Sequence, residues 1–356
     1  MNSIFSVEES KIFKNEEVLF PEYLPELLPH REDKIKQLAN NIFPVSRGRK
    51  AQNTFLFGSP GTGKTATTKF VFREFEEFSE RVKTIYINCW DYKSAHAILS
   101  KIAYELEVFV QRRGMSKDEI LEKLIEACKK TNKGLVVCLD EVDQLVFRGE
   151  EALYDLLRIN QYMQNPVCLV FISNNPNVFV DVEPRIKSSL GIEEVEFKPY
   201  SLEEMKDILQ ERVKLAFHSV EDGVVLLAAN HAVKSGSDVR VGLECLLRAG
   251  RLAEQENSNK VKVEHVKRIL SSIKPVKPRI LKERISEDER VVLEILEEKK
   301  ELFSVELYRE YCDRVGSPIS ERAFRDLINH LKETGLIRIK KLKGVKGRAR
   351  IITPKL

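Results

Sequence analysis

The segment GSPGTGKT at residues 58–65 constrains the fold of this 356-residue chain more than any other segment does. It matches the pattern G-x-x-x-x-G-K-[ST], in which glycines let successive backbone N–H groups turn toward a phosphate. The pattern carries this meaning only between a strand and a helix. Here the apolar run 53–57 precedes it, and residues 62–78, which follow, have the spacing of a helix. A strand, a phosphate loop and a helix in this order predict an α/β domain with a parallel sheet.

The side chains of this loop predict a nucleotide site. Lys64 is the cation expected at the β- and γ-phosphates, and the Thr65 hydroxyl is the expected Mg²⁺ ligand. A purely structural glycine turn would not require Lys64 followed by Thr65. We therefore expect ATP or ADP together with Mg²⁺ as cofactors. The expected nucleotide contacts in the loop are Gly58, Gly61, Thr62, Gly63, Lys64, Thr65 and Ala66.

A pair of acidic residues follows the apolar run 135–139. Carboxylates at the end of a buried strand are costly without a cation nearby. Asp140 therefore fits the Mg²⁺ shell through water, and Glu141 fits the base that orients the attacking water. The alternative is an acidic pair in an ordinary loop.

Further apolar runs predict the rest of the sheet. Continuous apolar runs are typical of strands that helices cover on both faces. Where the strand 167–172 ends, the Asn174 amide is expected to bond both the γ-phosphate and the attacking water, with Asn175 as the alternative. The remaining strands are expected at residues 83–88 and 195–197.

The pattern changes after residue 200 and again after residue 273. Four helical segments without an intervening strand predict a helical lid, and Pro275 and Pro278 indicate a semi-rigid linker. The lid helices are expected at residues 202–215, 223–234, 239–256 and 263–271. The predicted organisation is an α/β domain at 1–200, the lid at 201–273, the linker at 274–284 and a last domain at 285–356.

The last domain has the pattern of a winged helix. Helical segments at 287–298, 305–315 and 321–334 precede strands at 336–342 and 348–353. The third helix buries a stripe of Ala323, Phe324, Leu327, Ile328 and Leu331 and turns a polar face outward. Such a helix can read base edges in the major groove, although some winged helices bind proteins instead. The expected DNA contacts are Ser320, Arg322, Arg325 and Asn329 on the helix, and Lys343, Lys346 and Arg348 on the wing.

Charge is concentrated at the same end of the chain. The net charge of +4 includes eight basic and no acidic residues in the segment 336–356. This distribution is typical of a nucleic-acid-binding end, and the alternative is a solvated basic tail.

Other features exclude membrane and disulfide-based classes. The longest apolar run is too short to span a bilayer, and residues 1–9 lack the basic and apolar regions of a signal peptide. The six scattered cysteines indicate reduced thiols. We therefore expect a cytoplasmic, nucleoid-associated protein that does not bind membranes.

Taken together, these motifs resemble those of the AAA+ ATPases, and among them the archaeal replication initiators. That family is homologous to the eukaryotic origin recognition complex and its cell-division-cycle helicase-loading partner. The resemblance covers essentially the whole chain. It also rests on six further segments. They are similar to the family's adenine-side segment (19–25 and 29–32), its arginine-finger box (183–190), its lid entry (198–200 and 209–212) and its lid arginine motif (237–240).

The resemblance implies roles for residues outside the phosphate loop. Arg185 would be the arginine finger, Tyr200 and Arg212 nucleotide contacts, and Arg240 a γ-phosphate sensor. The residues alone leave open that Arg185 is an ordinary surface arginine and that Tyr200 packs a hinge.

The family also carries an extra helical insertion that touches DNA. Here this insertion corresponds to the two helical patterns at 94–111 and 117–130, with Arg112 and Arg113 at the basic tip between them. The alternative is a solvated helix end.

Some residues depart from the family pattern. Ser237–Arg240 reads Ser-Asp-Val-Arg instead of Gly-Asp-Ala-Arg, Glu183 replaces an aspartate, and Trp90 replaces a polar residue. These departures indicate a diverged paralogue with slow or conditional hydrolysis.

The sequence thus predicts an ATPase that acts as a molecular switch and initiates DNA replication at origins. Its expected partners are double-stranded origin DNA, paralogous initiator subunits and the replicative helicase. The alternative is a signalling or transposition-helper ATPase whose winged helix binds protein. A salt-dependent duplex-binding assay separates the two.

Overall fold

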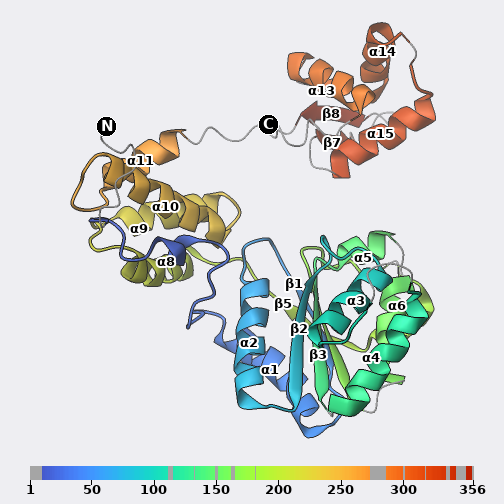
Figure 1. Ribbon diagram of the computed structural model, residues 1–356. Coiled ribbons are helices and arrows are strands. Elements are labelled where there is room, and N and C mark those ends of the chain that lie inside the picture. The colour runs from blue at the N-terminus through green and yellow to red at the C-terminus, as the bar shows by residue number, and fades with distance from the viewer. Residues whose placement is uncertain are drawn as a thin grey trace, which may run out of the picture. The chain divides into compact units, whose positions relative to one another are not determined.

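The chain forms two compact units, Met1–Ser271 and Ser272–Leu356, in a computed structural model (Figure 1). The structure describes residues 10–110, 115–131, 133–148, 151–161, 165–180, 182–272, 286–299, 301–316, 318–333, 337–341 and 350–354. None of the helices in these ranges is long and apolar enough to cross a bilayer.

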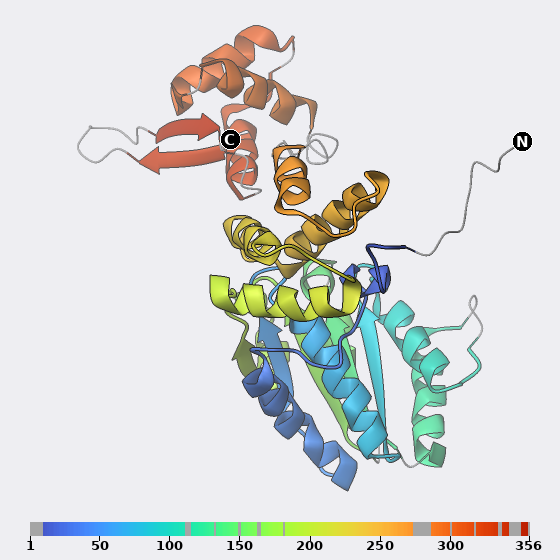
Figure 2. The same ribbon diagram turned by 90° about the vertical axis from the view of Figure 1, so that its left-hand side faces the viewer.

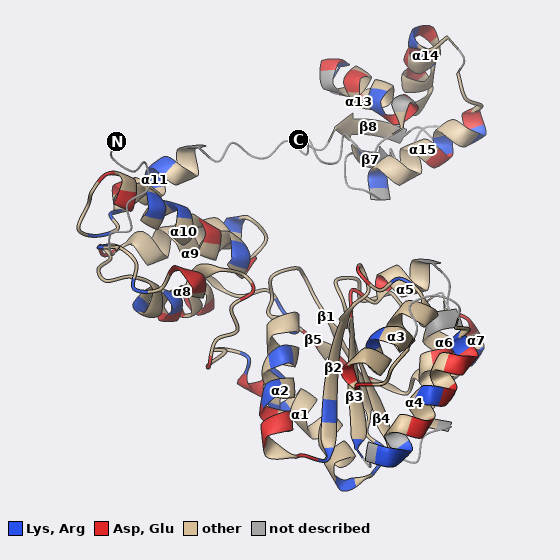
Figure 3. Ribbon diagram, in the orientation of Figure 1, with Lys and Arg blue, Asp and Glu red and all other residues tan. Residues whose placement is uncertain are grey.

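A five-stranded parallel sheet forms the centre of the first unit, as the sequence predicts. Its order is β2-β3-β4-β1-β5, so β1, which leads into the phosphate loop, lies between β4 and β5. The three central strands carry a single charged residue, Asp140, whereas charges are frequent on the helices (Figure 3). The strands are β1 (Asn53–Phe57), β2 (Val82–Asn88), β3 (Gly134–Asp140), β4 (Val167–Ser173) and β5 (Ile192–Glu196).

The predicted bounds of the last strand are wrong. We expected residues 195–197, but β5 pairs with β1 from Ile192 onward. Three of the five residues of this edge strand are glutamates and only Val195 is buried, so the segment lacks an apolar run.

Helices cover both faces of the sheet (Figure 1). On one face, α1 (Glu32–Ile42) and α2 (Lys64–Phe78) share an apolar core with β3 and β4. On the other face lie α3 (Ala95–Glu105), α4 (Lys117–Thr131), α6 (Glu151–Arg158) and α7 (Pro184–Leu190). The remaining elements are α5 (Asp143–Arg148) and the 3-10 helices η2 (Phe43–Arg47) and η3 (Ile159–Gln161).

Helix α3 is shorter than predicted. The pattern indicated a helix to residue 111, but α3 ends at Glu105. Glu107 adopts a left-handed conformation with φ of 58°, and the Val108 N–H donates back to the Ala103 carbonyl. This turn closes the helix although apolar residues continue beyond it.

The lid contains the four predicted helices, α8 (Leu202–Ala216), α9 (Val224–Lys234), α10 (Val239–Gln255) and α11 (Val263–Ser272). The N-terminal segment, with the 3-10 helix η1 (Glu16–Leu19), packs on them (Figure 2). Phe13 and Phe217 lie against Gly250, where an added Cβ would be 2.4 Å from the Phe13 ring. The segment is therefore part of the lid's core.

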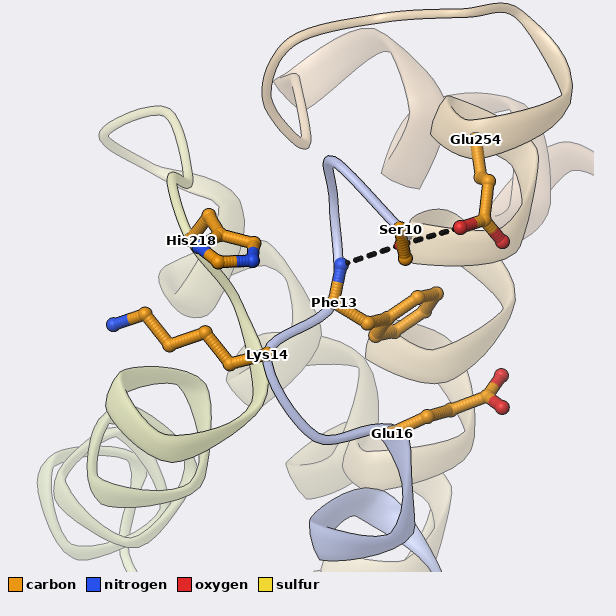
Figure 4. Close-up of a pocket in the computed structure, with 6 residues that line it drawn as sticks. All are labelled: Ser10, Phe13, Lys14, Glu16, His218 and Glu254. Atoms are coloured by element: carbon orange, nitrogen blue, oxygen red, sulfur yellow. Dashed lines mark hydrogen bonds between the residues drawn. The ribbon is translucent and has the colours of Figure 1, made fainter. Parts of the chain in front are cut away.

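A cavity of about 570 Å³ lies beside this N-terminal segment (Figure 4). Ser10 donates to the Glu254 carboxylate at its edge. None of its lining residues belongs to the predicted nucleotide site.

In the residues that the structure describes, the second unit has three helices and a small antiparallel sheet. The sheet has the order β6-β8-β7, and the hairpin of β7 and β8 is visible in Figure 2. The sequence predicted the helices and this hairpin but missed β6, which has only two residues. The elements are α13 (Glu287–Lys299), β6 (Leu302–Phe303), α14 (Ser304–Arg314), α15 (Glu321–Glu333), β7 (Ile337–Lys341) and β8 (Arg350–Pro354).

Candidate nucleotide site

The phosphate loop lies between β1 and α2 and depends on glycine for its shape. Gly61 has φ of +70°, and a Cβ there would lie 2.0 Å from the Asp238 carboxylate of the lid. Gly58 has φ of +147°, and a Cβ there would lie 2.2 Å from the Phe197 carbonyl oxygen. A larger residue at either position would be strained and would collide with its neighbour. Gly63 caps α2, which begins at Lys64 and has Ala66 in its first turn.

Lys64 is buried under the loop and donates three hydrogen bonds. Its ammonium group bonds the carbonyls of Gly58 and Ser59 at 2.7 and 2.9 Å, and the Asn174 amide oxygen at 2.9 Å. Burial lowers the pKa of Lys64 to about 8, against the opposing effect of the Asp140 and Glu141 carboxylates. The cation is thus placed at the loop, and its charge depends on the surrounding carboxylates.

The acidic pair lies at the carboxyl end of β3, beside the start of α2. The Thr65 hydroxyl donates to Asp140 Oδ2 at 2.7 Å. A hydroxyl and a carboxylate side by side are hard oxygen donors, which fit Mg²⁺. In the described part of the chain, no three histidine, cysteine or acidic side chains gather into a metal cage. An ion here would therefore depend on phosphate and water oxygens for its remaining ligands.

Glu141 occupies a strained position. Its φ of 55° lies in the left-handed region, which is uncommon for a residue other than glycine. Burial, and then the neighbouring Asp140, raises the pKa of Glu141. The Asn174 amide nitrogen lies 3.5 Å from both of its carboxylate oxygens. The geometry thus brings together the predicted base and the predicted amide, with Asn174 between Glu141 and Lys64.

Arg240 approaches the same loop from the lid. The Val239 N–H lies 3.4 Å from the Gly61 carbonyl, so the start of α10 touches the phosphate loop. The Arg240 guanidinium pairs with the Asp238 carboxylate at 2.7 Å. This hydrogen-bonded pairing raises the pKa of Arg240 and, against burial, lowers that of Asp238.

Tyr200 and Arg212 lie at the junction of the sheet with the lid. Tyr200 is buried, and its hydroxyl would be 2.8 Å from a Cβ on Gly63, so the ring lies beside the loop. Arg212 donates to the carbonyls of Val18 and Tyr23 at 3.2 and 3.4 Å. It therefore holds the N-terminal segment on α8.

The sequence reasoning missed Arg31. This buried guanidinium lies 3.7 Å from the centre of the Tyr200 ring. It donates to Thr62 of the phosphate loop at 2.9 Å and to the Lys198 carbonyl at 3.0 Å. The sequence placed Arg31 in an adenine-side segment, but only the fold brings it between loop and lid.

The other predicted residues of the first unit are not gathered at this site. Arg185 is the second residue of α7 and its side chain is 81% exposed. Its guanidinium lies 3.5 Å from the Glu183 carboxylate. Arg112 and Arg113 lie outside the described residues.

Helix α15 presents a polar face in the second unit. Ser320 caps it by accepting from the Ala323 N–H at 3.3 Å. Phe324, Ile328 and Leu331 are buried as predicted, but Ala323 is exposed, because it lies in the first turn beyond the edge of the core. Arg322, Arg325 and Asn329 are exposed on the outer face, whereas Lys343, Lys346 and Arg348 lie outside the described residues.

Known proteins resemble the chain along its whole length. Residues 47–177 match the family model described as an AAA domain, and residues 206–269 match that of the Cdc6 AAA+ ATPase-type lid domain. An ORC1-type DNA replication protein 1 from Archaeoglobus fulgidus is 38% identical over 93% of this chain and 85% of its own length.

Two solved structures from Aeropyrum pernix resemble it as well. The ORC1 protein in complex with DNA has a TM-score of 0.77 at 31% identity and covers 98% of this chain and 94% of its own. The ORC2 protein, solved as ADPNP-ADP complexes, has a TM-score of 0.74 at 21% identity, covering 96% and 94%. At that identity, the second likeness concerns the fold alone.

Proposed function

Because the chain belongs to the family of ORC1-type DNA replication proteins, we propose that it is an ATP-dependent origin-binding protein that initiates DNA replication. Its sheet and lid have the AAA+ ATPase fold. The proposal rests mainly on one observation: the likeness to this family covers both units, including the nucleotide site and α15.

In the proposed cycle, ATP binds with its phosphates against the loop and Lys64. Thr65, and Asp140 through water, would hold Mg²⁺, whose charge would offset that of the phosphates. Glu141 is the base that orients the attacking water, and its raised pKa suits a proton acceptor. Asn174 would hydrogen-bond both the γ-phosphate and the attacking water that Glu141 orients. Arg240 would contact the γ-phosphate from the lid.

Hydrolysis would be slow and would act as a switch between assembly states. Arg185 is exposed and far in sequence from the phosphate loop, which suits a finger that reaches the nucleotide of a paralogous subunit. Tyr200 and Arg212 contribute to the nucleotide pocket, Arg212 through the N-terminal segment that it holds.

We propose that the second unit is a winged helix that binds double-stranded origin DNA. The exposed Arg325 and Asn329 of α15 can reach base edges in the major groove, since arginine reads guanine and asparagine reads adenine. The wing, with Lys343, Lys346 and Arg348, would add phosphate contacts.

Arg112 and Arg113 would provide a second DNA contact from the first unit. After the protein has bound the origin on the nucleoid, it would recruit the replicative helicase.

Binding of the full chain to origin-containing and unrelated duplexes at several salt concentrations tests this proposal. Arg325→Ala should cost about 1–3 kcal/mol on preferred sites and relax the preference there. The matched control is Arg309→Ala, which removes an exposed arginine from α14 and should leave the preference intact. Absence of salt-dependent duplex binding would instead favour a protein-binding winged helix in a signalling or transposition-helper ATPase.

A further inference from the structure

A tyrosine outside every motif of the nucleotide site is bonded to its acidic residue. The Tyr86 hydroxyl donates to Asp140 Oδ2 at 2.6 Å. The same oxygen accepts from the Thr65 hydroxyl at 2.7 Å, while Asp140 Oδ1 accepts from the Glu141 N–H at 2.9 Å. Both oxygens of this buried carboxylate therefore have fixed partners.

The fold aims Tyr86 at this carboxylate from the neighbouring strand. Tyr86 lies on β2 and pairs with Cys138 of β3, which is two residues before Asp140 on the same strand. Ile85 and Ile87 point into the core on the side of α3, whereas Tyr86 packs on the side of α2. The Lys69 ammonium of α2 lies 4.6 Å from its ring centre. Strand alternation thus brings the phenol to the start of α2, where the phosphate loop ends.

The hydroxyl remains a donor in this environment. A phenol hydroxyl is protonated at neutral pH, so Tyr86 donates to the Asp140 carboxylate. An O–H that donates to a carboxylate at about 2.6 Å is a charge-assisted bond, roughly twice as strong as a neutral one.

We propose that Tyr86 is a positioning residue for the magnesium site, because its hydroxyl fixes the rotamer of Asp140. The proposal rests on the proposed ATP site. With Tyr86 in place, Oδ2 stays directed at the Thr65 hydroxyl, and the carboxylate is ready for the water shell of an ion that Thr65 ligates. Without this bond, only the Thr65 hydroxyl and the Glu141 N–H hold the Asp140 carboxylate, so its rotamer is less firmly fixed before the ion binds.

The test is the Mg²⁺ dependence of nucleotide binding, which needs no turnover. The affinity of a fluorescent ATP analogue is measured in EDTA and across a Mg²⁺ titration for the wild-type chain and Tyr86→Phe. Partners in the outer shell of a metal are typically worth about 10–100-fold in metal affinity. Because Asp140 acts through water, we expect the lower end. The Mg²⁺ concentration that gives half of the maximal change in analogue affinity should rise about tenfold. The analogue affinity measured in EDTA should stay unchanged.

Thr84→Val is the matched control. Thr84 lies two residues earlier on β2, and its hydroxyl donates at 2.9 Å to Glu76 instead of Asp140. Its removal should not change the Mg²⁺ dependence. In an Asp140→Asn background, Tyr86→Phe should have no further effect on that dependence, since the partner is already altered.

The outcomes separate this inference from the proposed function. A wild-type Mg²⁺ dependence in Tyr86→Phe overturns the inference, and so does an equal loss of affinity with and without Mg²⁺, which indicates a merely structural role. If the wild-type chain binds the analogue in neither condition, the proposed ATP site itself is wrong.

Discussion

The buried lysine of the phosphate loop makes nucleotide affinity depend on pH in a window that can be calculated. Burial lowers the pKa of Lys64 to about 8. At about pH 7 roughly nine molecules in ten carry the charge, and at about pH 9 roughly one in ten does. A bound phosphate raises the pKa of the lysine, so binding above pH 8 requires proton uptake. The affinity should therefore fall about tenfold between pH 7 and pH 9.

Titration calorimetry in EDTA measures this fall. A phosphomonoester has a second pKa of about 6, so the nucleotide is almost fully ionised across the window. Parallel runs in buffers of different ionisation enthalpy count the protons taken up. Uptake should rise from near zero at pH 7 toward one proton at pH 9.

Two variants identify the titrating group. Asp140 raises the pKa of Lys64, so Asp140→Asn should move the fall in affinity to lower pH. Lys69→Met removes an exposed lysine of the same helix and should leave the pH profile unchanged. An affinity that is constant from pH 7 to pH 9, or a profile that Asp140→Asn does not move, would refute the reasoning.

Other perturbations test the remaining parts of the site. Glu141→Gln should keep ATP binding and abolish turnover, because only the base is lost; normal phosphate release would contradict the assignment. Arg185→Ala should leave the ATP affinity of the monomer unchanged and lower the ATPase rate of assemblies, and a loss of affinity in the monomer would make Arg185 an intramolecular ligand instead. Arg31→Met removes bonds to the Thr62 and Lys198 carbonyls and should lower the free energy of unfolding by about 2–3 kcal/mol in urea melts. An unchanged melt would show that water replaces Arg31 without cost.

Where elements have a strong local pattern, the sequence predicted the fold well. Continuous apolar runs identify β3 and β4, because helices cover both of their faces. The lid helices and α15 have the spacing of amphipathic helices. Five elements were not predicted. Of these, α5, α6, α7 and β6 are short, whereas α1 has eleven residues and an amphipathic pattern that could have identified it. The edge strand β5 was misplaced because exposed glutamates interrupt its apolar residues.

The residues of the candidate site likewise separate into those that have a local sequence signal and those that have none. Lys64, Thr65 and Asp140 could be named in advance, because their chemistry is tied to a loop or to the end of a strand. No spacing rule predicts that Arg31 lies on Tyr200, since the two are far apart in the chain and meet only when the lid packs beside the sheet.

Local sequence therefore determined the phosphate loop, the sheet class and the acidic pair, whereas tertiary structure decided which side chains support them. The bond from Tyr86 to Asp140 exists because β2 pairs with β3 in parallel and in one register. A shift of that register by one residue would turn the phenol to the opposite face of the sheet. Strand pairing is a long-range property that depends on the packing of the whole core, so it cannot be read from the residues around either partner.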